Sequence, residues 1–237
     1  MLKPLAGSYP GIQICARRGI FQVSVWPNPK GKELIGSFKS SAMNTVHVVS
    51  AYVHWGVANV VKRFSPKSAL DMGGVGKMSH FLRCSMTDAN IIDNLDATDL
   101  PFADNAFDVA LSIATLEHVG DWANFLLESL RVSKTAAVHW FPMGSAATEA
   151  EDLKEKLGHF HPCSILSRIA IEDFLMKCSA QWTLAPFMTV GEHLLLLCTI
   201  NPNINHPDTF AAVQRMGAEP YGVLLTMTKT ADSHDPR

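Results

Sequence analysis

The run Ser68–Gly76, with the sequence SALDMGGVG, constrains the possible folds more than any other part of the chain. Its first half is mainly apolar, as in a buried strand, and its glycines lead into a short helical pattern at Lys77–Leu82. Glycine lets the backbone adopt positive φ angles and lets a ligand approach the main chain closely. The run therefore predicts a strand, a turn and a helix in succession, with Asp71 at the end of the strand. The turn is either a ligand contact or an ordinary tight connection.

Strand and helix patterns alternate along the rest of the chain. The expected strands are Cys84–Ile91, Phe107–Ser112, Ala136–Phe141, Trp182–Met188 and His193–Ile200. The expected helices are Asp121–Val132, Ala146–Leu157 and Ser167–Cys178. Such alternation indicates a doubly wound α/β domain with a mostly parallel sheet. A Val-Gly pair separates the last two expected strands, so we expect them to form an antiparallel pair at the sheet edge.

The N-terminal part of the chain has a different pattern. Residues 11–26 alternate apolar and polar residues around an Arg-Arg-Gly turn, which predicts a β-hairpin. Between Lys39 and Lys62 there is no charged residue, and a segment of this length could span a bilayer. Polar residues interrupt it and its apolar residues recur with a helical period, so we expect a half-buried helix instead. These apolar residues are Val46, Val49, Val53, Val57, Val60, Val61 and Phe64.

These patterns divide the chain into three parts. They are a hairpin and cap helix in residues 1–65, the α/β domain in residues 66–228 and a disordered tail in residues 229–237. The cap helix has a second face of small and imidazole side chains, formed by His47, Ala51, His54 and Ala58. We expect the N-terminal part to capture substrate, to associate with a second copy in a homodimer, or simply to cover the sheet.

Composition and charge narrow the functional classes. The chain has 237 residues, of which 47% are hydrophobic, enough for one large core, and its formal net charge is −2. Basic residues occur at most as adjacent pairs, with no long run, which argues against nucleic-acid binding by charge. Five scattered cysteines without a CxxC motif indicate reduced thiols, and the N-terminus lacks the apolar core of a signal peptide. We therefore expect a cytoplasmic protein that does not insert into membranes.

Two polar residues near the end of the second expected strand are candidates for binding a nucleotide ribose. Asp88 and Asn90 follow Asp71 by 17 and 19 residues. In nucleotide-binding α/β folds, a residue about 20 positions further along the chain bonds the ribose hydroxyls. The alternative for each is a solvated residue at a strand end.

The most specific signal is the run Asp96–Val119, with the sequence DATDLPFADNAFDVALSIATLEHV. Together with the glycine turn before it and the helix and strand after it, this run resembles type 11 class I S-adenosylmethionine-dependent methyltransferases over roughly Ser68–Pro142. The resemblance implies a Rossmann-like, mostly parallel seven-stranded sheet with an antiparallel edge strand, and S-adenosylmethionine as cofactor. It departs from the family pattern where Val75 and Lys77 replace glycines, and where the segment between Asp71 and Asp96 is short.

The resemblance also implies roles for individual residues. Those around the methionine part of the cofactor are Asp71, Gly73, Gly74 and Gly76. The ribose lies at Asp88 or Asn90, and the adenine at Asp96 and Ala97. Ser112 and Ile113 lie beneath the cofactor, and His118 lies near the face where the methyl group is transferred.

Two histidines are candidate catalytic residues. A base is needed only if the accepting oxygen, nitrogen or sulfur is protonated, and His118 is one candidate base, or a structural histidine at a helix start. The cluster His159-Phe-His161-Pro-Cys163 either lines a substrate pocket through His161, holds a metal or is a structural loop. His47 and His54 lie about 10 Å apart on a helix, too far to share one ion. We therefore expect no metal.

The functional prediction is methyl transfer from S-adenosylmethionine to an oxygen, nitrogen or sulfur of a small molecule. The hairpin, the valine-rich helix and residues 144–168 are expected to form the acceptor pocket. One alternative is a non-catalytic methyltransferase-like subunit, which Val75 and Lys77 would favour. Another is a nicotinamide-dependent enzyme, which the absence of GxGxxG disfavours.

Overall fold

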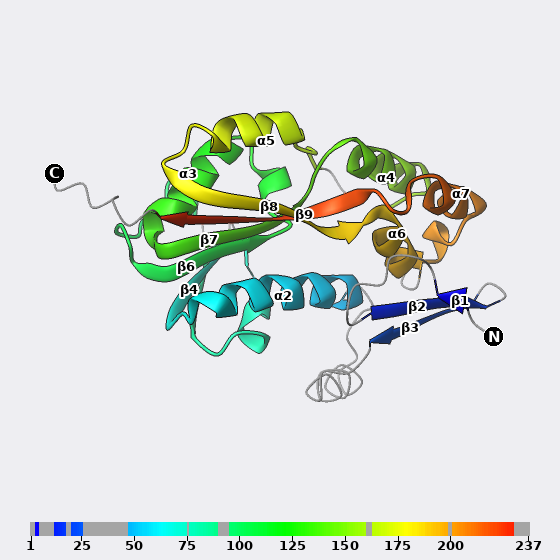
Figure 1. Ribbon diagram of the computed structural model, residues 1–237, viewed down its shortest axis with the longest axis horizontal. Coiled ribbons are helices and arrows are strands. Elements are labelled where there is room, and N and C mark those ends of the chain that lie inside the picture. The colour runs from blue at the N-terminus through cyan, green and yellow to red at the C-terminus, as the bar shows by residue number, and fades with distance from the viewer. Residues whose placement is uncertain are drawn as a thin grey trace.

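A six-stranded sheet with helices on both faces forms the body of the molecule (Figure 1). The structure is a computed structural model that describes residues 3–4, 12–17, 20–25, 47–74, 76–89, 95–159, 163–198 and 201–229, with side chains from Tyr52 onward. Among these residues, no helix has both the length and the apolar character needed to cross a membrane.

The elements follow one another in an alternating order. The strands are β1 (Lys3–Pro4), β2 (Ile12–Arg17), β3 (Ile20–Val25), β4 (Ser68–Met72), β5 (Ser85–Ala89), β6 (Phe107–Ile113), β7 (Ser133–Pro142), β8 (Ala180–Thr189) and β9 (Pro220–Lys229). The α-helices are α2 (His47–Val61), α3 (Trp122–Val132), α4 (Ser145–Lys156), α5 (Arg168–Leu175), α6 (Val190–Cys198) and α7 (Pro207–Met216). The 3-10 helices are η1 (Lys62–Phe64), η2 (Lys77–His80), η4 (Leu116–His118) and η5 (Pro202–Ile204).

The order of strands in the main sheet is β5-β4-β6-β7-β9-β8. The first four strands are parallel, and β9 lies antiparallel to both β7 and β8. The predicted fold class is confirmed, with six strands in the described residues where seven were expected. The antiparallel strand β9 is inserted one position inside the edge, which β8 occupies. The predicted hairpin is also confirmed, because β2 pairs with β3 in antiparallel register.

The prediction of a strand at His193–Ile200 is wrong. Val190–Cys198 forms helix α6, in which Leu194, Leu195, Leu196 and Leu197 are all buried. A helix buried on nearly all sides shows no polar face in its sequence, so a short leucine run cannot be told from a buried strand. The antiparallel partner of β8 is β9, a strand that the sequence analysis missed together with α7. The expected tail begins at Lys229, the last residue of β9, and otherwise lies outside the described residues.

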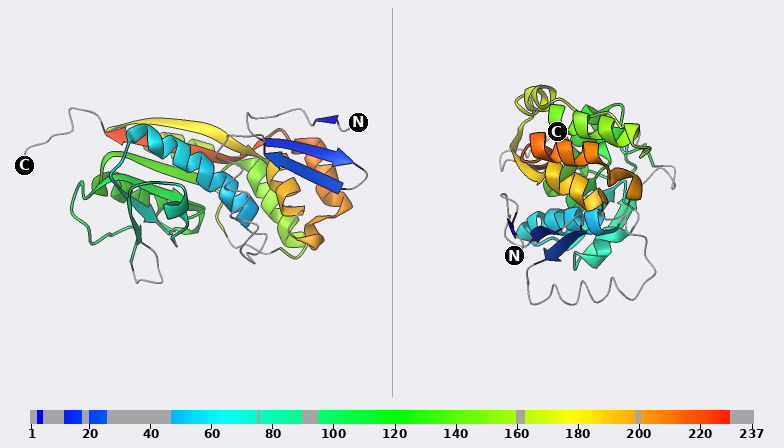
Figure 2. Two further views of the ribbon diagram at one scale, coloured as in Figure 1. Left: turned by 90° about the horizontal axis from the view of Figure 1, so that it is seen from below. Right: turned by 90° about the vertical axis from the view of Figure 1, so that its right-hand side faces the viewer.

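Each face of the sheet has its own apolar cluster of buried side chains. One gathers α2, α4, α6 and α7 and contains Val53, Val57 and Val61 of α2 at 1% exposure or less. The other gathers α3 and α5 and includes Phe125 and Ile171. The valine-rich helix therefore packs directly on the sheet, on the face opposite α3 and α5 (Figure 2). On this helix Ala58 and His54 are also buried, whereas the side chains of His47 and Ala51 lie outside the description.

A buried histidine links the centre of the sheet to α3. His139 on β7 is fully buried, with Nδ1 2.8 Å from the Ser112 hydroxyl and Nε2 3.0 Å from the Ser129 hydroxyl. Because Ser129 donates its own proton to the carbonyl of Leu126, it accepts from Nε2–H, and Ser112 donates to Nδ1. The hydrogen bonds thus select one neutral tautomer of His139. Burial lowers the pKa of His139 to about 3.

We predict that His139 makes folding acid-sensitive. Its pKa is lower in the folded protein than the ordinary value of 6.5, so only the unfolded chain takes up this proton between pH 6.5 and about 3. The contribution is intact above pH 6.5 and is lost by about 1.4 kcal/mol per pH unit as the pH falls through that window. Denaturant unfolding of wild type and His139→Gln should show their stability difference shrinking at this rate from pH 6 to pH 4. Other buried groups titrate in both proteins and cancel, so a constant difference would contradict the assignment.

Candidate functional site

Acidic and glycine residues meet at the carboxyl ends of β4, β5 and β6. Asp71 near the end of β4 lies directly opposite Asp88 of β5 in the parallel register. Parallel strands point their carboxyl ends to one edge, where the connecting loops build binding sites in this class of sheet. The two predicted carboxylates are therefore brought together. Asn90, the other candidate for ribose binding, lies outside the described residues.

The glycine turn after β4 fits closely over this edge. Gly73 has φ +89°, its N–H donates to the carbonyl of Ala89 at 2.6 Å, and an added Cβ would clash with the side chain of Thr115. A Cβ on Gly74 would clash with the carboxyl of Asp71. These two glycines are thus required by the protein's own packing.

Gly76 differs from the two glycines before it. It also has a positive φ, of +80°, but the nearest atom to an added Cβ is the Asp88 carboxylate oxygen at 3.8 Å. Among the described residues, the turn therefore leaves free space beside Asp88, as a close approach by a ligand requires. This open side of the turn is the position at which the residues fit a nucleotide cofactor.

Asp71 is a strongly perturbed acid at this edge. It is 3% exposed, and burial raises its pKa to about 7, with a further rise from the charge of Asp88 and an opposing effect of Lys77. A carboxyl held in this state is stabilised as a carboxylate by an incoming cation. The site thus suits a ligand with an ammonium group. The charge of Lys77, where the family pattern has glycine, already acts on Asp71.

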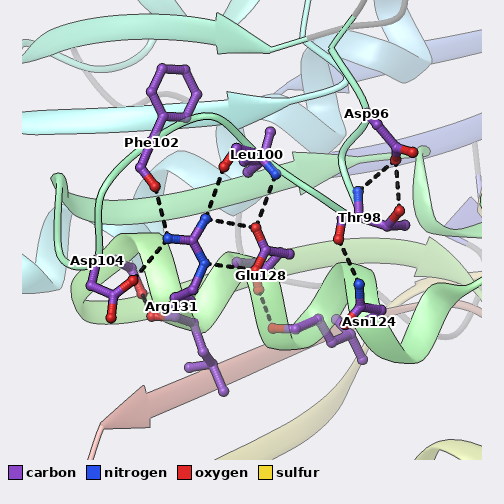
Figure 3. Close-up of polar contacts among 12 residues, drawn as sticks. Asp96, Thr98, Leu100, Phe102, Asp104, Asn124, Glu128 and Arg131 are labelled. Carbon is purple, nitrogen blue, oxygen red and sulfur yellow. Dashed lines mark hydrogen bonds and ion pairs between the residues drawn. The ribbon is translucent and has the colours of Figure 1, made fainter. Parts of the chain in front are cut away.

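The predicted adenine-binding residues lie in the loop before β6. The Oδ1 atom of Asp96 accepts from the backbone N–H of Thr98 at 2.8 Å and from its hydroxyl at 2.7 Å, which lowers the pKa of the exposed Asp96 carboxyl (Figure 3). Asn124 of α3 donates to the Thr98 carbonyl at 2.5 Å. Ala97 is half-buried and packs against the core. These contacts fix the direction of a loop that is otherwise open to solvent.

Arg131 of α3 fastens the rest of this loop (Figure 3). It donates to the carbonyls of Leu100 and Phe102 at 2.9 and 2.7 Å, and to Asp104 at 2.8 Å. Its Nε and Nη2 atoms pair with both carboxylate oxygens of Glu128, which also accepts from the N–H of Leu100 at 3.0 Å. Planar, bidentate pairing of this kind is strong and directional. The LPF stretch of the predicted signature is thus held on α3, just after Asp96.

The remaining predicted residues lie at the end of β6 and in the turn that follows it, in different surroundings. Ser112 is buried and uses its hydroxyl on His139, and Ile113 is half-buried beside it. His118 is exposed at the end of η4.

Glu117, the residue before His118, is a functional candidate that the sequence analysis missed. It is 2% exposed, and its Oε2 has no hydrogen-bond partner among the described residues. Burial raises its pKa to about 8, and the charge of Glu151 adds to the rise. The LEHV motif pointed to this turn, but a sequence does not show which of its two titratable residues faces inward.

The predicted cluster of His159, His161 and Cys163 is only partly described by the structure, and His161 lies outside the described residues. Nδ1 of His159 is 3.0 Å from the side-chain amide of Asn201, and burial and the charge of Lys154 lower the pKa of His159. Cys163 has a free thiol. Burial and nearby carboxylates raise its pKa to about 11. No group of three potential metal ligands occurs in the part of the chain that the structure describes.

Comparison with protein families identifies this region. Residues 75–141 match the family model described as a methyltransferase domain, of type 11. The resemblance to type 11 class I methyltransferases that the sequence predicts is thus confirmed over this part of the chain. The cofactor predicted with that family, S-adenosylmethionine, agrees with the match. A comparison with curated proteins finds no match.

Solved structures share the fold at low sequence identity. One is a putative sarcosine dimethylglycine methyltransferase from Galdieria sulphuraria, with 13% identity and a TM-score of 0.52 over 85% of this chain and 97% of that one. Another is geranyl diphosphate C-methyltransferase from Streptomyces coelicolor A3(2), solved with S-adenosyl-L-homocysteine, with 15% identity and a TM-score of 0.51 over 69% and 73% of the two chains. At these identities the likeness shows the class of fold.

We predict that Arg131 is a main determinant of stability at this edge. Arg131→Ala removes several charge-assisted hydrogen bonds and leaves two carbonyls and Glu128 without their donor, so it should lower the free energy of unfolding by about 3 kcal/mol. Arg168→Ala is the matched control, because Arg168 forms an exposed pair with Glu172 and its loss should cost less than about 1 kcal/mol. Denaturant unfolding measures both. Equal losses in the two variants would show that the Arg131 contacts do not hold the loop.

Proposed function

We propose that this chain binds S-adenosylmethionine across the carboxyl ends of β4 and β5 and transfers its methyl group to an oxygen, nitrogen or sulfur of a small molecule. The observation that carries this proposal is the buried Asp71 carboxyl beneath a glycine turn that is open beside Asp88. The pKa of Asp71 stays raised despite the charge of Lys77, so a further cation would stabilise the carboxylate, and the methionine part of the cofactor has an ammonium group.

The remaining residues have assigned roles in this proposal. Asp71, Gly73, Gly74 and Gly76 bind the methionine part, and Asp88 or Asn90 bonds the ribose. Asp96 accepts from the adenine amino group while Ala97 contacts the ring. Ser112 and Ile113 support the cofactor from below, through the backbone in the case of Ser112 because its hydroxyl is engaged with His139.

The protein's own contribution to the reaction is to align the acceptor with the methyl group. The bound cofactor supplies an activated methyl group on a sulfonium with a good leaving group. The chain's residues hold the acceptor in line with that methyl group and exclude water from it. Where the acceptor is protonated, a base must also take its proton. The candidates are Glu117 and His118 at this end of the sheet, and His161, which lies outside the described residues. We expect turnover without an added metal ion.

A non-catalytic subunit is the second candidate. One observation favours it, namely that the Lys77 charge already acts on Asp71 at a position where the family pattern has glycine. In that case Lys77 takes the place of the cofactor's ammonium group. For the enzyme we propose a cytoplasmic location, a small-molecule acceptor rather than nucleic acid or membrane, and the N-terminal residues 1–65 as acceptor-binding or dimer-forming elements around the α/β domain.

We predict that cofactor affinity rises with pH through the titration of Asp71. The folded protein has its Asp71 pKa near 7, so ligand binding must remove a proton below that pH. Calorimetry should show S-adenosylhomocysteine binding about tenfold more tightly at pH 8 than at pH 6. Asp71→Asn should bind about 10- to 100-fold more weakly at pH 8, with little pH dependence.

Asp173→Asn is the control for this experiment, because Asp173 is an exposed carboxylate on α5, distant from the turn. It should behave as wild type. If wild type fails to bind S-adenosylhomocysteine at millimolar concentration, the non-catalytic candidate replaces the enzyme.

A further inference from the structure

A second group of buried polar side chains lies beside the proposed cofactor site. We name it the Glu117 cluster, and its members are Glu117, Glu151, Lys154, His193 and Tyr221. They come from η4, α4, α6 and the start of β9. Glu117 follows β6, and Tyr221 lies next to the end of β7, because the N–H of Met143 donates to the Tyr221 carbonyl at 3.0 Å. The cluster therefore borders the carboxyl edge of the sheet, where the acceptor must meet the cofactor.

The other four side chains of the cluster contact one another. Lys154 is 3% exposed, and its Nζ lies 2.6 and 2.7 Å from the two carboxylate oxygens of Glu151 and 3.3 Å from Nε2 of His193. Tyr221 donates to Glu151, and its ring stacks on His193 with centroids 3.7 Å apart. The Lys154 ammonium thus lies among two carboxylate oxygens and an imidazole nitrogen. Its charge is therefore paired with that of Glu151.

Glu117 is the member without a counter-charge. Glu151 and Lys154 neutralise each other, so ionisation of Glu117 adds one negative charge that no group in the cluster balances. Its Oε2 atom is buried and has no hydrogen-bond partner in the described part of the chain. A buried polar atom in this state is costly to folding and is expected where a ligand completes the hydrogen bonding. A donor with a positive charge would both satisfy Oε2 and balance the charge of an ionised Glu117.

We propose that Glu117 binds the ammonium group of an amine acceptor and takes its proton before methyl transfer. This inference rests on the proposed function and narrows its acceptor to a primary or secondary amine. An alcohol or a thiol offers a hydrogen-bond donor to Oε2 but leaves the charge of an ionised Glu117 unbalanced. The high pKa of Glu117 supports the assignment, because a carboxylate with a pKa near 8 accepts a proton from an ammonium more readily than an ordinary one.

The proton and electron balance of the step is simple. The ammonium gives one proton to the Glu117 carboxylate, which leaves a neutral nitrogen with a lone pair. That lone pair forms the new bond to the methyl carbon, and the bond between this carbon and sulfur breaks, with its electron pair remaining on sulfur. The products are the N-methylated ammonium, S-adenosylhomocysteine and protonated Glu117. The proton on Glu117 then leaves to solvent before the next cycle.

The backbone of Glu117 contacts the part of the chain after α4. The N–H of Ser164 donates to the Glu117 carbonyl at 2.8 Å, and Ser164 is exposed while its neighbour Cys163 is half-buried. The titratable groups that couple electrostatically to Glu117 or to one another around it are Glu151, Lys154, Cys163 and Tyr221. Tyr221 has a pKa well above 10, so neither it nor Cys163 changes charge at neutral pH.

Calorimetry with defined probes tests the proposal on the full chain. Methylamine and benzylamine are titrated at pH 7 in phosphate and in Tris, two buffers whose heats of ionisation differ, with methanol and benzyl alcohol as neutral counterparts. At least one amine should bind, at least 30-fold more tightly than its alcohol. Binding should release close to one proton, because the incoming ammonium ionises Glu117.

The variants separate charge from shape. Glu117→Gln should weaken amine binding at least 30-fold and abolish the proton release, and Glu117→Asp should restore part of both. Glu155→Gln, on the exposed side of α4, should match wild type. Proton release is the decisive readout, since a purely structural role of Glu117 would not produce it.

Three outcomes overturn the proposal: neither amine binds, an alcohol binds as well as its amine, or Glu117→Gln binds amine and releases a proton as wild type does. S-adenosylhomocysteine is titrated in parallel. If it binds and the amines do not, the amine site is wrong while the proposed function stands. If the amines bind as described and it does not, the proposed function fails and the cation site remains.

Discussion

The common direction of β5, β4, β6 and β7 is the constraint on which the candidate site depends. Buried parallel strands satisfy their backbone within the sheet, so polar side chains concentrate in the loops at the strand ends. That arrangement brings the glycine turn after β4 against Thr115 after β6, two segments that are distant in sequence. It also places two buried carboxyls, Asp71 and Glu117, at the same edge, after neighbouring strands.

The two carboxyls share a physical state and differ in their neighbours. Burial raises the pKa of each into the neutral range. Asp71 lies near another carboxylate and a lysine, beneath a turn that is open on one side. Glu117 lies against an ion pair that is already complete. Each is protonated at little cost when alone and becomes charged when a cation arrives, so the edge is prepared for two cationic groups. An amine acceptor and the cofactor's amino acid part are the two that methyl transfer to nitrogen requires.

Much of this arrangement could be predicted from the sequence, because its signals are local. The glycine turn follows β4 as expected, and Asp121 caps α3 through a hydrogen bond to the N–H of Asn124 at 3.1 Å. The errors arise where the decisive contact is distant. The leucine run of α6 is buried by helices from elsewhere in the chain, which hides its helical period. The inward position of Glu117 depends on α4 and β9, which the LEHV motif does not contain. Arg131 likewise looks like any helix-surface arginine until the loop folds back onto it (Figure 3).

A crystal structure of the chain with S-adenosylhomocysteine tests the central claim most directly. The account predicts density for the ligand at the carboxyl ends of β4 and β5, with its amino acid part at Asp71, its ribose beside Gly76 and Asp88 and its adenine at Asp96. The sulfur should point toward the turn that holds Glu117. Ligand bound at another edge of the sheet, or a Lys77 ammonium paired with Asp71 in its place, would contradict the account.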